Sequence, residues 1–253
     1  MRLVLETVDG VPLVKPGDDL AAVVIGAFEK SGLSLADQDV VVVAQKIVSK
    51  AEGRLVDLAA VTPSPRAVEL GKATDKDPRL IEVILGESVE VVRHKPGVIV
   101  VEHRLGFVMA NAGVDRSNVK ADGMKEPVLL LPADPDGSAS TLKAALDKAF
   151  GADVGIVISD SVGRAWRNGT VGLALGAAGL PALDDRRGRP DLFGRKLEVT
   201  EVAVADQIAA AAAILMGEGD EGRPLVLVRG ISWTAPARPA KDLVRPKTVD
   251  LFR

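Results

Sequence analysis

The chain has 253 residues, 47% of them hydrophobic, with 32 basic residues against 35 acidic ones and no cysteine. The lack of cysteine excludes disulfides, thiolate catalysis and cysteine-ligated metal centres. A balanced charge, 3% aromatic residues and no long apolar segment predict a cytoplasmic protein that binds neither nucleic acid nor a membrane.

The first elements in chain order are a short strand over 3–5 and a helix over 18–30, whose first residue, an aspartate, is a favourable N-cap. Gly32 is placed to end that helix. The run 39–44 (DVVVVA) is continuously apolar and β-branched, which predicts a strand buried on both faces. The polar stretch 45–50 follows at once, so it lies where a central strand reaches the edge of a sheet, a common place for ligand contacts.

Residues 64–87 have a helical pattern, broken near Asp77-Pro78. Three short strands separated by turn signals follow, at 89–94, 98–102 and 106–109. Because they succeed one another closely, we expect antiparallel pairing. The segment 111–118 (NAGVDRSN) has the composition of a loop.

Apolar residues recur at helical spacing over 142–150, with Ser138 or Ser140 as candidate caps and Gly151 as the end. A second helix is predicted over 204–215. The run 154–159 (VGIVIS) predicts another buried strand.

Polar residues follow that strand too, at 160–169, which we interpret as a loop. The segment 184–192 is the most loop-like internal stretch, and 225–229 returns to strand. No repeat or linker is visible. Short strands and helices without strict alternation favour an α+β fold in one unit, 1–253, rather than a doubly wound sheet.

The spacing of Gly217, Gly219 and Gly222 matches GxGxxG, but the match follows a helix and carries three acids, so it does not indicate a dinucleotide-binding fold. It is either a solvated acidic turn or a loop that meets phosphates through a cation. Lys46 and Lys50 could supply charge to a triphosphate, although isolated lysines are usually solvent-exposed.

Asp115 and Asp160 both follow short apolar strands among neutral polar residues, a setting that suits a hard divalent cation. The alternative is that each is a turn residue. Arg164 and Arg167 flank Trp166 in a polar loop that could bind an anionic group of a substrate, or that could be a surface loop.

Several long strings resemble the family of GTP-dependent ligases that add L-glutamate to coenzyme F420, a deazaflavin. The resemblance spans nearly the whole chain. Its longest strings are DVVVVAQKIVSKAEGR (39–54), NAGVDRSNV (111–119), LPADPDGSA (131–139), ISDSVGRAWRNG (158–169) and EVTEVAVADQIAAAA (198–212).

The resemblance implies two interleaved α+β subdomains with mixed, mostly antiparallel sheets, a homodimer, GTP, and two sites for Mg²⁺ or Mn²⁺, with K⁺ as a further candidate ion. The implied metal ligands are Asp115, Asp160, Ser161 and Glu218. The implied GTP contacts are Val11, Pro12, Leu13, Val14, Gln45, Lys46, Lys50, Asn118, Met216, Gly217, Glu218, Gly219, Asp220, Glu221, Gly222 and Arg223. We expect no C-terminal flavin-binding domain of the kind that larger relatives carry.

The implied reaction activates a carboxylate of the glutamate-free coenzyme as an acyl phosphate, which the amine of glutamate attacks; further glutamate is then added through the γ-carboxyl. Two alternatives stay open at this point. One is a nucleotide- or deazaflavin-binding paralogue without catalysis, and the other is an amide ligase that acts on a different carboxylate.

Overall fold

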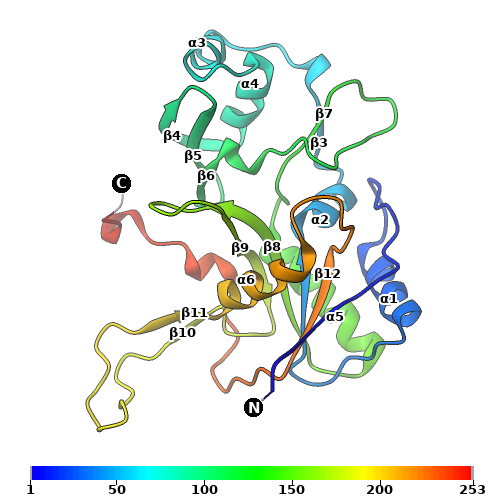
Figure 1. Cartoon of the computed structure of the whole chain (residues 1–253), viewed down its shortest axis with the longest axis vertical. Helices are drawn as coiled ribbons and strands as arrows, with labels where there is room; N and C mark the ends of the chain where they lie inside the picture. The colour runs from blue at the N-terminus through cyan, green and yellow to red at the C-terminus, as the bar shows by residue number, and fades with distance from the viewer. Residues whose placement is uncertain (1, 252–253) are drawn as a thin grey trace.

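The computed structural model describes residues 2–251, which form a body and a second lobe above it (Figure 1). The body is built on a five-stranded sheet. Its strands, in spatial order, are β1 (Val4–Thr7), β12 (Leu225–Arg229), β2 (Val40–Ala44), β8 (Gly155–Gly163) and β9 (Thr170–Ala178). Only β2 and β8 run parallel in this sheet. The α+β class and the predominance of antiparallel pairing are confirmed.

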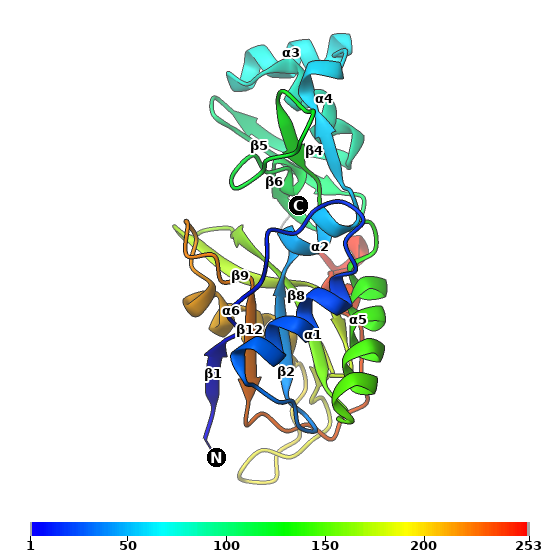
Figure 2. The ribbon, with the colours of Figure 1, turned by 90° about the vertical axis from the view of Figure 1, so that its right-hand side faces the viewer.

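Helices cover both faces of this sheet. The helices α1 (Leu20–Ser31) and α5 (Pro135–Phe150) pack on one face, and α6 (Val204–Met216) packs on the other (Figure 2). Alternate valines of β2 therefore enter two different cores: Val41 and Val43 face α1 and α5, whereas Val40 and Val42 face α6. All four are fully buried, as the unbroken apolar run predicts.

The start of α1 differs from the prediction by one residue. Asp19, not Asp18, is the N-cap, and its side chain accepts a hydrogen bond from the Ala22 N–H at 3.1 Å. Asp18 instead accepts from the Lys15 N–H at 2.8 Å, which stabilises the preceding turn. Gly32 ends the helix in the left-handed conformation, as predicted.

The helix α5 begins seven residues earlier than the apolar spacing indicated, at Pro135. Proline has its φ already fixed for the first helical position, and Asp134 caps the helix by accepting from the Gly137 N–H at 3.1 Å. The prediction of Ser138 or Ser140 as caps was therefore wrong. Gly151 ends the helix as expected.

The second lobe has its own hydrophobic core. Helices α3 (Pro65–Thr74) and α4 (Pro78–Gly86) confirm the break predicted at Asp77-Pro78. The three expected antiparallel strands are present as β4 (Ser88–Lys95), β5 (Val98–His103) and β6 (Val108–Ala110). A short ladder of β3 (Leu55–Asp57) with β7 (Pro127–Leu129) leads back toward the body.

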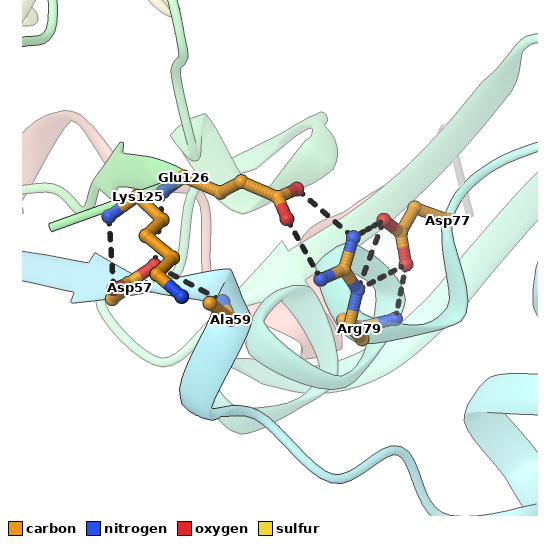
Figure 3. Close-up of polar contacts among 6 residues, drawn as sticks. All are labelled: Asp57, Ala59, Asp77, Arg79, Lys125 and Glu126. Atoms are coloured by element: carbon orange, nitrogen blue, oxygen red, sulfur yellow. Dashed lines mark hydrogen bonds and ion pairs between the residues drawn. The ribbon is translucent and has the colours of Figure 1, made fainter.

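Three carboxylates hold the entry to β7 in place (Figure 3). The guanidinium of Arg79 bridges Asp77 at 2.6 Å and Glu126 at 2.9 Å. Asp57 accepts backbone N–H bonds, which lower its pKa, from Ala59, Lys125 and Glu126. These contacts fasten the segment before β7 to both α4 and β3.

The strand predicted over 154–159 is present as β8, but its full length and the strand β9 that follows it were not predicted. β8 does not stop at Ser159 but continues to Gly163, and β9 returns beside it, so the loop prediction for 160–169 holds only at the hairpin tip. β9 is rich in glycine and alanine because the helices α5 and α6 pack closely against its two faces. A Cβ added at Gly172 would overlap the Ala209 carbonyl of α6, and one at Gly176 would overlap Pro135 of α5.

A long arm extends from the body below α6 (Figure 1). Its base is the ladder of β10 (Leu183–Asp185) with β11 (Glu201–Ala203), so the predicted loop 184–192 begins inside a strand. Leu192 and Phe193, near the far end, are 98% and 95% exposed. No helix within residues 2–251 has the length and apolar composition needed to cross a bilayer.

A buried imidazole gives the second lobe a pH-dependent stability. The His103 ring is fully buried; its Nδ1 accepts the Leu105 N–H at 3.0 Å, and its Nε2 lies 3.4 Å from Glu87 Oε2. Burial lowers the pKa of His103 to about 4, although the Glu87 carboxylate opposes the change; Arg104 and Arg54 add to the lowering. The neutral ring is therefore the native form.

The free energy of unfolding is expected to fall as the pH drops from about 6.5 to about 4, because the unfolded imidazole takes up a proton before the folded one does. His103 contributes on the order of 3 kcal/mol of stability that is fully present above pH ~6.5 and lost near pH ~4. Urea unfolding measured at several pH values across this range should show that the free energy of unfolding changes less with pH in His103→Asn than in the wild type. The asparagine Oδ1 can still accept the Leu105 N–H. His94→Asn, which replaces an exposed histidine, is the matched control. The assignment would be contradicted if the free energy of unfolding changed equally with pH in the two variants.

Candidate functional site

The candidate site forms at the edge of the sheet where the parallel strands β2 and β8 end. Ala44 pairs with Ser159, so the residues that follow them, Gln45 and Asp160, lie next to each other. Gln45 is buried, accepts from the Ser49 hydroxyl at 2.9 Å, and hydrogen-bonds to the Asp160 carboxylate. The helix α2 (Gln45–Ala51) begins here and brings two lysines to the same edge.

Lys46 joins this edge to the second lobe. Its Nζ lies 2.7 Å from Asp115 Oδ2 and 2.7 Å from Ser117 Oγ. The Ser117 N–H also donates to Asp115 Oδ1, at 2.7 Å. Burial alone would raise the pKa of Asp115, but the hydrogen bonds from Lys46 and Ser117 outweigh it and hold the pKa below its usual value.

A strained turn delivers Asp115 to this position. Asn111, Ala112 and Gly113 all have left-handed backbone conformations, with φ of 55°, 54° and 67°. Two of the three are not glycine, which costs on the order of 1–2 kcal/mol each. The turn is followed by a two-way backbone bridge between Asp115 and Leu129, at 3.0 and 2.9 Å, which fixes the carboxylate relative to β7.

Asp160 has the most perturbed carboxylate of the site. Its pKa is raised to about 6, mainly by burial and in smaller part by the nearby Asp115 carboxylate. The Ser161 N–H, Lys46 and Gln45 act in the opposite direction. Asp160 lies inside β8, not in a loop as predicted, so the strand ladder with Leu173 of β9 holds its backbone.

The acidic loop 217–223 reaches the same edge from the other side, because it enters β12, the antiparallel neighbour of β2. The Asn118 Nδ2 donates to the Gly219 carbonyl at 2.9 Å, and Lys50 Nζ donates to the Asn118 carbonyl at 2.8 Å. Burial, then the neighbouring Lys46, lowers the pKa of Lys50. Segments more than a hundred residues apart thus meet here.

The conformation of this loop requires its first glycine. Gly217 has φ +73°, and a Cβ there would overlap the carboxylate of Glu221. That carboxylate folds back and accepts the Gly219 N–H at 2.8 Å. Glu218 points elsewhere and accepts from the Thr170 hydroxyl of β9 at 3.3 Å. The structure thus ties Glu218 to the β8–β9 hairpin, on which Ser161 also lies.

The predicted N-terminal contact segment lies beside α2 in the view of Figure 2. Val14 is buried in the core under α1, and Val11 packs against the same core, whereas Leu13 is 89% exposed. The Gly17 N–H donates to the Ala51 carbonyl at 2.9 Å, which anchors the segment to the end of α2.

Arg164 and Arg167 lie apart from these contacts, on the exposed tip of the β8–β9 hairpin. Arg164 donates to the Gly169 carbonyl at 3.2 Å, within the tip itself. Among the described residues, neither arginine forms an ion pair with Asp115 or Asp160. Sequence reasoning treated Ser117 only as a neutral polar neighbour of Asp115 and gave Thr170 no role, yet they hydrogen-bond to Asp115 and to Glu218. A single small hydroxyl residue carries no signal of its own in a sequence.

The arrangement can accommodate a divalent cation that also binds phosphate. No group of three histidine, cysteine, aspartate or glutamate side chains within residues 2–251 is arranged to hold a metal by itself. Asp115 and Asp160 are nevertheless close enough to repel one another electrostatically. Mg²⁺ is commonly held by one or two carboxylates with water and substrate phosphates, so two carboxylates beside two lysines fit such a cation.

Known proteins are similar to this chain over most of its length. A model of the family described as F420-0:gamma-glutamyl ligase matches residues 10–230. A protein of Methanothermobacter thermautotrophicus named coenzyme F420:L-glutamate ligase is 48% identical over 255 residues, covering 100% of both chains. Proteins of the same name from Methanocaldococcus jannaschii and Archaeoglobus fulgidus are 46% and 42% identical, over 87% and 100% of this chain and 86% and 97% of theirs. The chain therefore belongs to the F420-0:gamma-glutamyl ligase family and is a ligase.

Proposed function

We propose that this enzyme uses GTP to attach L-glutamate to the glutamate-free form of coenzyme F420 and then adds further γ-linked glutamate. The observation that carries the proposal is the convergence of Lys46, Asp115 and Asp160 at one sheet edge, with the acidic loop 217–223 facing them. The proposed acceptor and amino acid are those in the names of relatives that match the chain over its whole length, coenzyme F420 and L-glutamate.

The nucleotide would bind with its phosphates toward α2. Lys46 and Lys50 supply positive charge there, and Gln45 and Asn118 supply amide groups. The remaining proposed contacts are the segment Val11 to Val14 and the loop from Met216 to Arg223. The first segment is anchored to the end of α2, and the second contacts Asn118, which is hydrogen-bonded to Lys50 of α2. Both can therefore contact one ligand bound beside α2.

Asp115 and Asp160 would hold Mg²⁺ or Mn²⁺ between them and the phosphates, and Ser161 and Glu218 complete the proposed ligand set. A bound divalent cation offsets charge on the transferring phosphoryl group. Lys46, which already forms an ion pair with Asp115, would turn toward a phosphate oxygen when that carboxylate binds the cation. K⁺ is a further candidate ion.

The proposed reaction has two steps. A carboxylate oxygen of the coenzyme precursor attacks the γ-phosphorus of GTP, so that GDP leaves and an acyl phosphate forms. The glutamate nitrogen then attacks the acyl carbon, phosphate leaves with the bonding electrons, and the nitrogen loses a proton to give the amide. Lys46 and Lys50 would stabilise charge on the phosphates in the first step.

A homodimer is part of the proposal. The arm beyond β10 and β11 carries Leu192 and Phe193 almost fully exposed, and apolar side chains at the end of a projecting arm are typical of an interface (Figure 1).

The proposal is tested by incubating the purified protein with GTP, Mn²⁺, L-glutamate and the glutamate-free coenzyme, followed by mass spectrometry. We expect the coenzyme to gain one or more glutamyl residues, with GDP and phosphate released in equal amounts. GTP that binds without turnover would instead indicate a binding paralogue. Turnover with a different acid would indicate another amide ligase.

A further inference from the structure

A cavity of about 420 Å³ opens in the second lobe beside Asp115. One wall is the turn between α3 and α4, which includes Lys76 and Asp77, and the other runs from Asn111 to Arg116. Such a volume lies in the range of small-molecule sites. Asp115 belongs both to this wall and to the proposed metal site, so a molecule in the cavity would lie next to that proposed site.

The charges along the cavity are not all paired. Asp77 is neutralised by Arg79 (Figure 3), and Asp115 is neutralised by Lys46. Lys76 and Arg116, in contrast, form no hydrogen bond or ion pair through their side chains in the part of the chain that the structure describes. Asp75 also lines the cavity with an exposed carboxylate. The cavity therefore presents two cations and one carboxylate without hydrogen-bonded side-chain partners among the described residues, which suits a ligand that carries both carboxylates and an amine.

The backbone holds Lys76 firmly. The preceding residue, Asp75, ends α3 in the left-handed conformation with φ 54°, and the Lys76 N–H donates to the Gly71 carbonyl at 3.0 Å. The following residue, Asp77, caps α4. Lys76 is half-buried between the two helix ends. A ligand carboxylate in the cavity would form a charge-assisted contact with the Lys76 ammonium.

Asn111 adds a hydrogen-bond acceptor to the cations of the cavity. It lines the cavity, and its Oδ1 is buried without a hydrogen-bond partner. A half-turn of the side-chain amide exchanges Oδ1 and Nδ2, so Asn111 can offer an acceptor to an amine.

We propose that this cavity binds the amino-acid substrate of the ligase, with Lys76 and Arg116 recognising its carboxylates and Asn111 accepting from its amine. The inference rests on the proposed function. It deepens that function by assigning a dicarboxylic amino acid to a site separate from the nucleotide contacts on α2. The amine would then lie beside Asp115, next to the acyl phosphate that it attacks.

The test compares Lys76→Met and Arg116→Gln with Lys72→Met, which removes an exposed lysine from α3 outside the cavity. With GTP, Mn²⁺ and coenzyme saturating, each cavity variant should raise the KM for L-glutamate about tenfold or more, because each removes a charge-assisted contact. The KM for GTP should stay within about twofold of wild type. A smaller effect on L-glutamine than on L-glutamate would assign that cation to the side-chain carboxylate, and an equal effect would assign it to the α-carboxylate.

Calorimetric titration with L-glutamate distinguishes failure of the inference from failure of the proposed function. If the wild type ligates glutamate but both cavity variants keep its KM and its calorimetric affinity, the cavity is not the amino-acid site. If the wild type forms no product yet binds L-glutamate, and Lys76→Met or Arg116→Gln loses that binding, the proposed reaction is wrong and the site assignment stands.

Discussion

Asp115→Asn is expected to lower kcat for glutamate ligation by about a thousandfold or more, equivalent to roughly 4 kcal/mol of transition-state stabilisation. The asparagine keeps the size of the side chain and an oxygen that accepts the Ser117 N–H, so the loop should keep its shape. It removes the negative charge that pairs with Lys46 and that would hold the cation. Asp160→Asn should behave similarly, because it removes the other carboxylate of the pair.

The measurement is single-turnover formation of GDP and of the glutamylated product, with Mn²⁺ binding followed separately by titration. Asp122→Asn is the matched control, since it neutralises an exposed aspartate seven residues further along the same segment. Loss of activity together with weaker Mn²⁺ binding would support the ligand assignment. Full activity in Asp115→Asn would refute it.

The sheet itself could be predicted from the sequence because its central strands are buried on both faces. The runs 40–44 and 154–158 are unbroken apolar segments, and the polar residues that follow them mark the sheet edge where Gln45 and Asp160 lie together. The edge strand β9 could not be found in this way. Its composition reflects close packing against α5 and α6, for which small residues are required, rather than β propensity.

The individual residues of the site could be selected by chemical type, but their contacts could not. The bond from Asn118 to the Gly219 carbonyl joins residues 101 positions apart, and the bonds from Lys46 to Ser117 span 71. No local pattern encodes such distances. The cavity beside Asp115 was missed for the same reason, since Lys76 and Arg116 come from separate segments and are ordinary surface residues when considered singly.

Lys46→Met is expected to lower kcat/KM for GTP by about 10- to 100-fold, because a charge-assisted contact to a phosphate contributes on the order of 1.5–3 kcal/mol. Two effects combine in this variant. The phosphates lose a cation, and Asp115 loses the ammonium that lies 2.7 Å from it, which leaves two neighbouring carboxylates without that compensation. Lys50→Met removes only the first effect, since Lys50 donates to the Asn118 carbonyl and pairs with no carboxylate within residues 2–251, so the loss of kcat/KM should be smaller.

Steady-state kinetics with GTP varied at saturating glutamate and coenzyme would measure this difference, with Lys120→Met, an exposed lysine near the same loop, as the control. The order of effects is the informative result. If Lys46→Met and Lys50→Met were equally impaired, the pairing with Asp115 would contribute nothing to catalysis, and the two lysines would act only as phosphate ligands. If Lys46→Met raised the KM for glutamate and left that for GTP unchanged, the nucleotide would have to lie elsewhere, because Lys46 is the residue that joins α2 to the loop of Asp115.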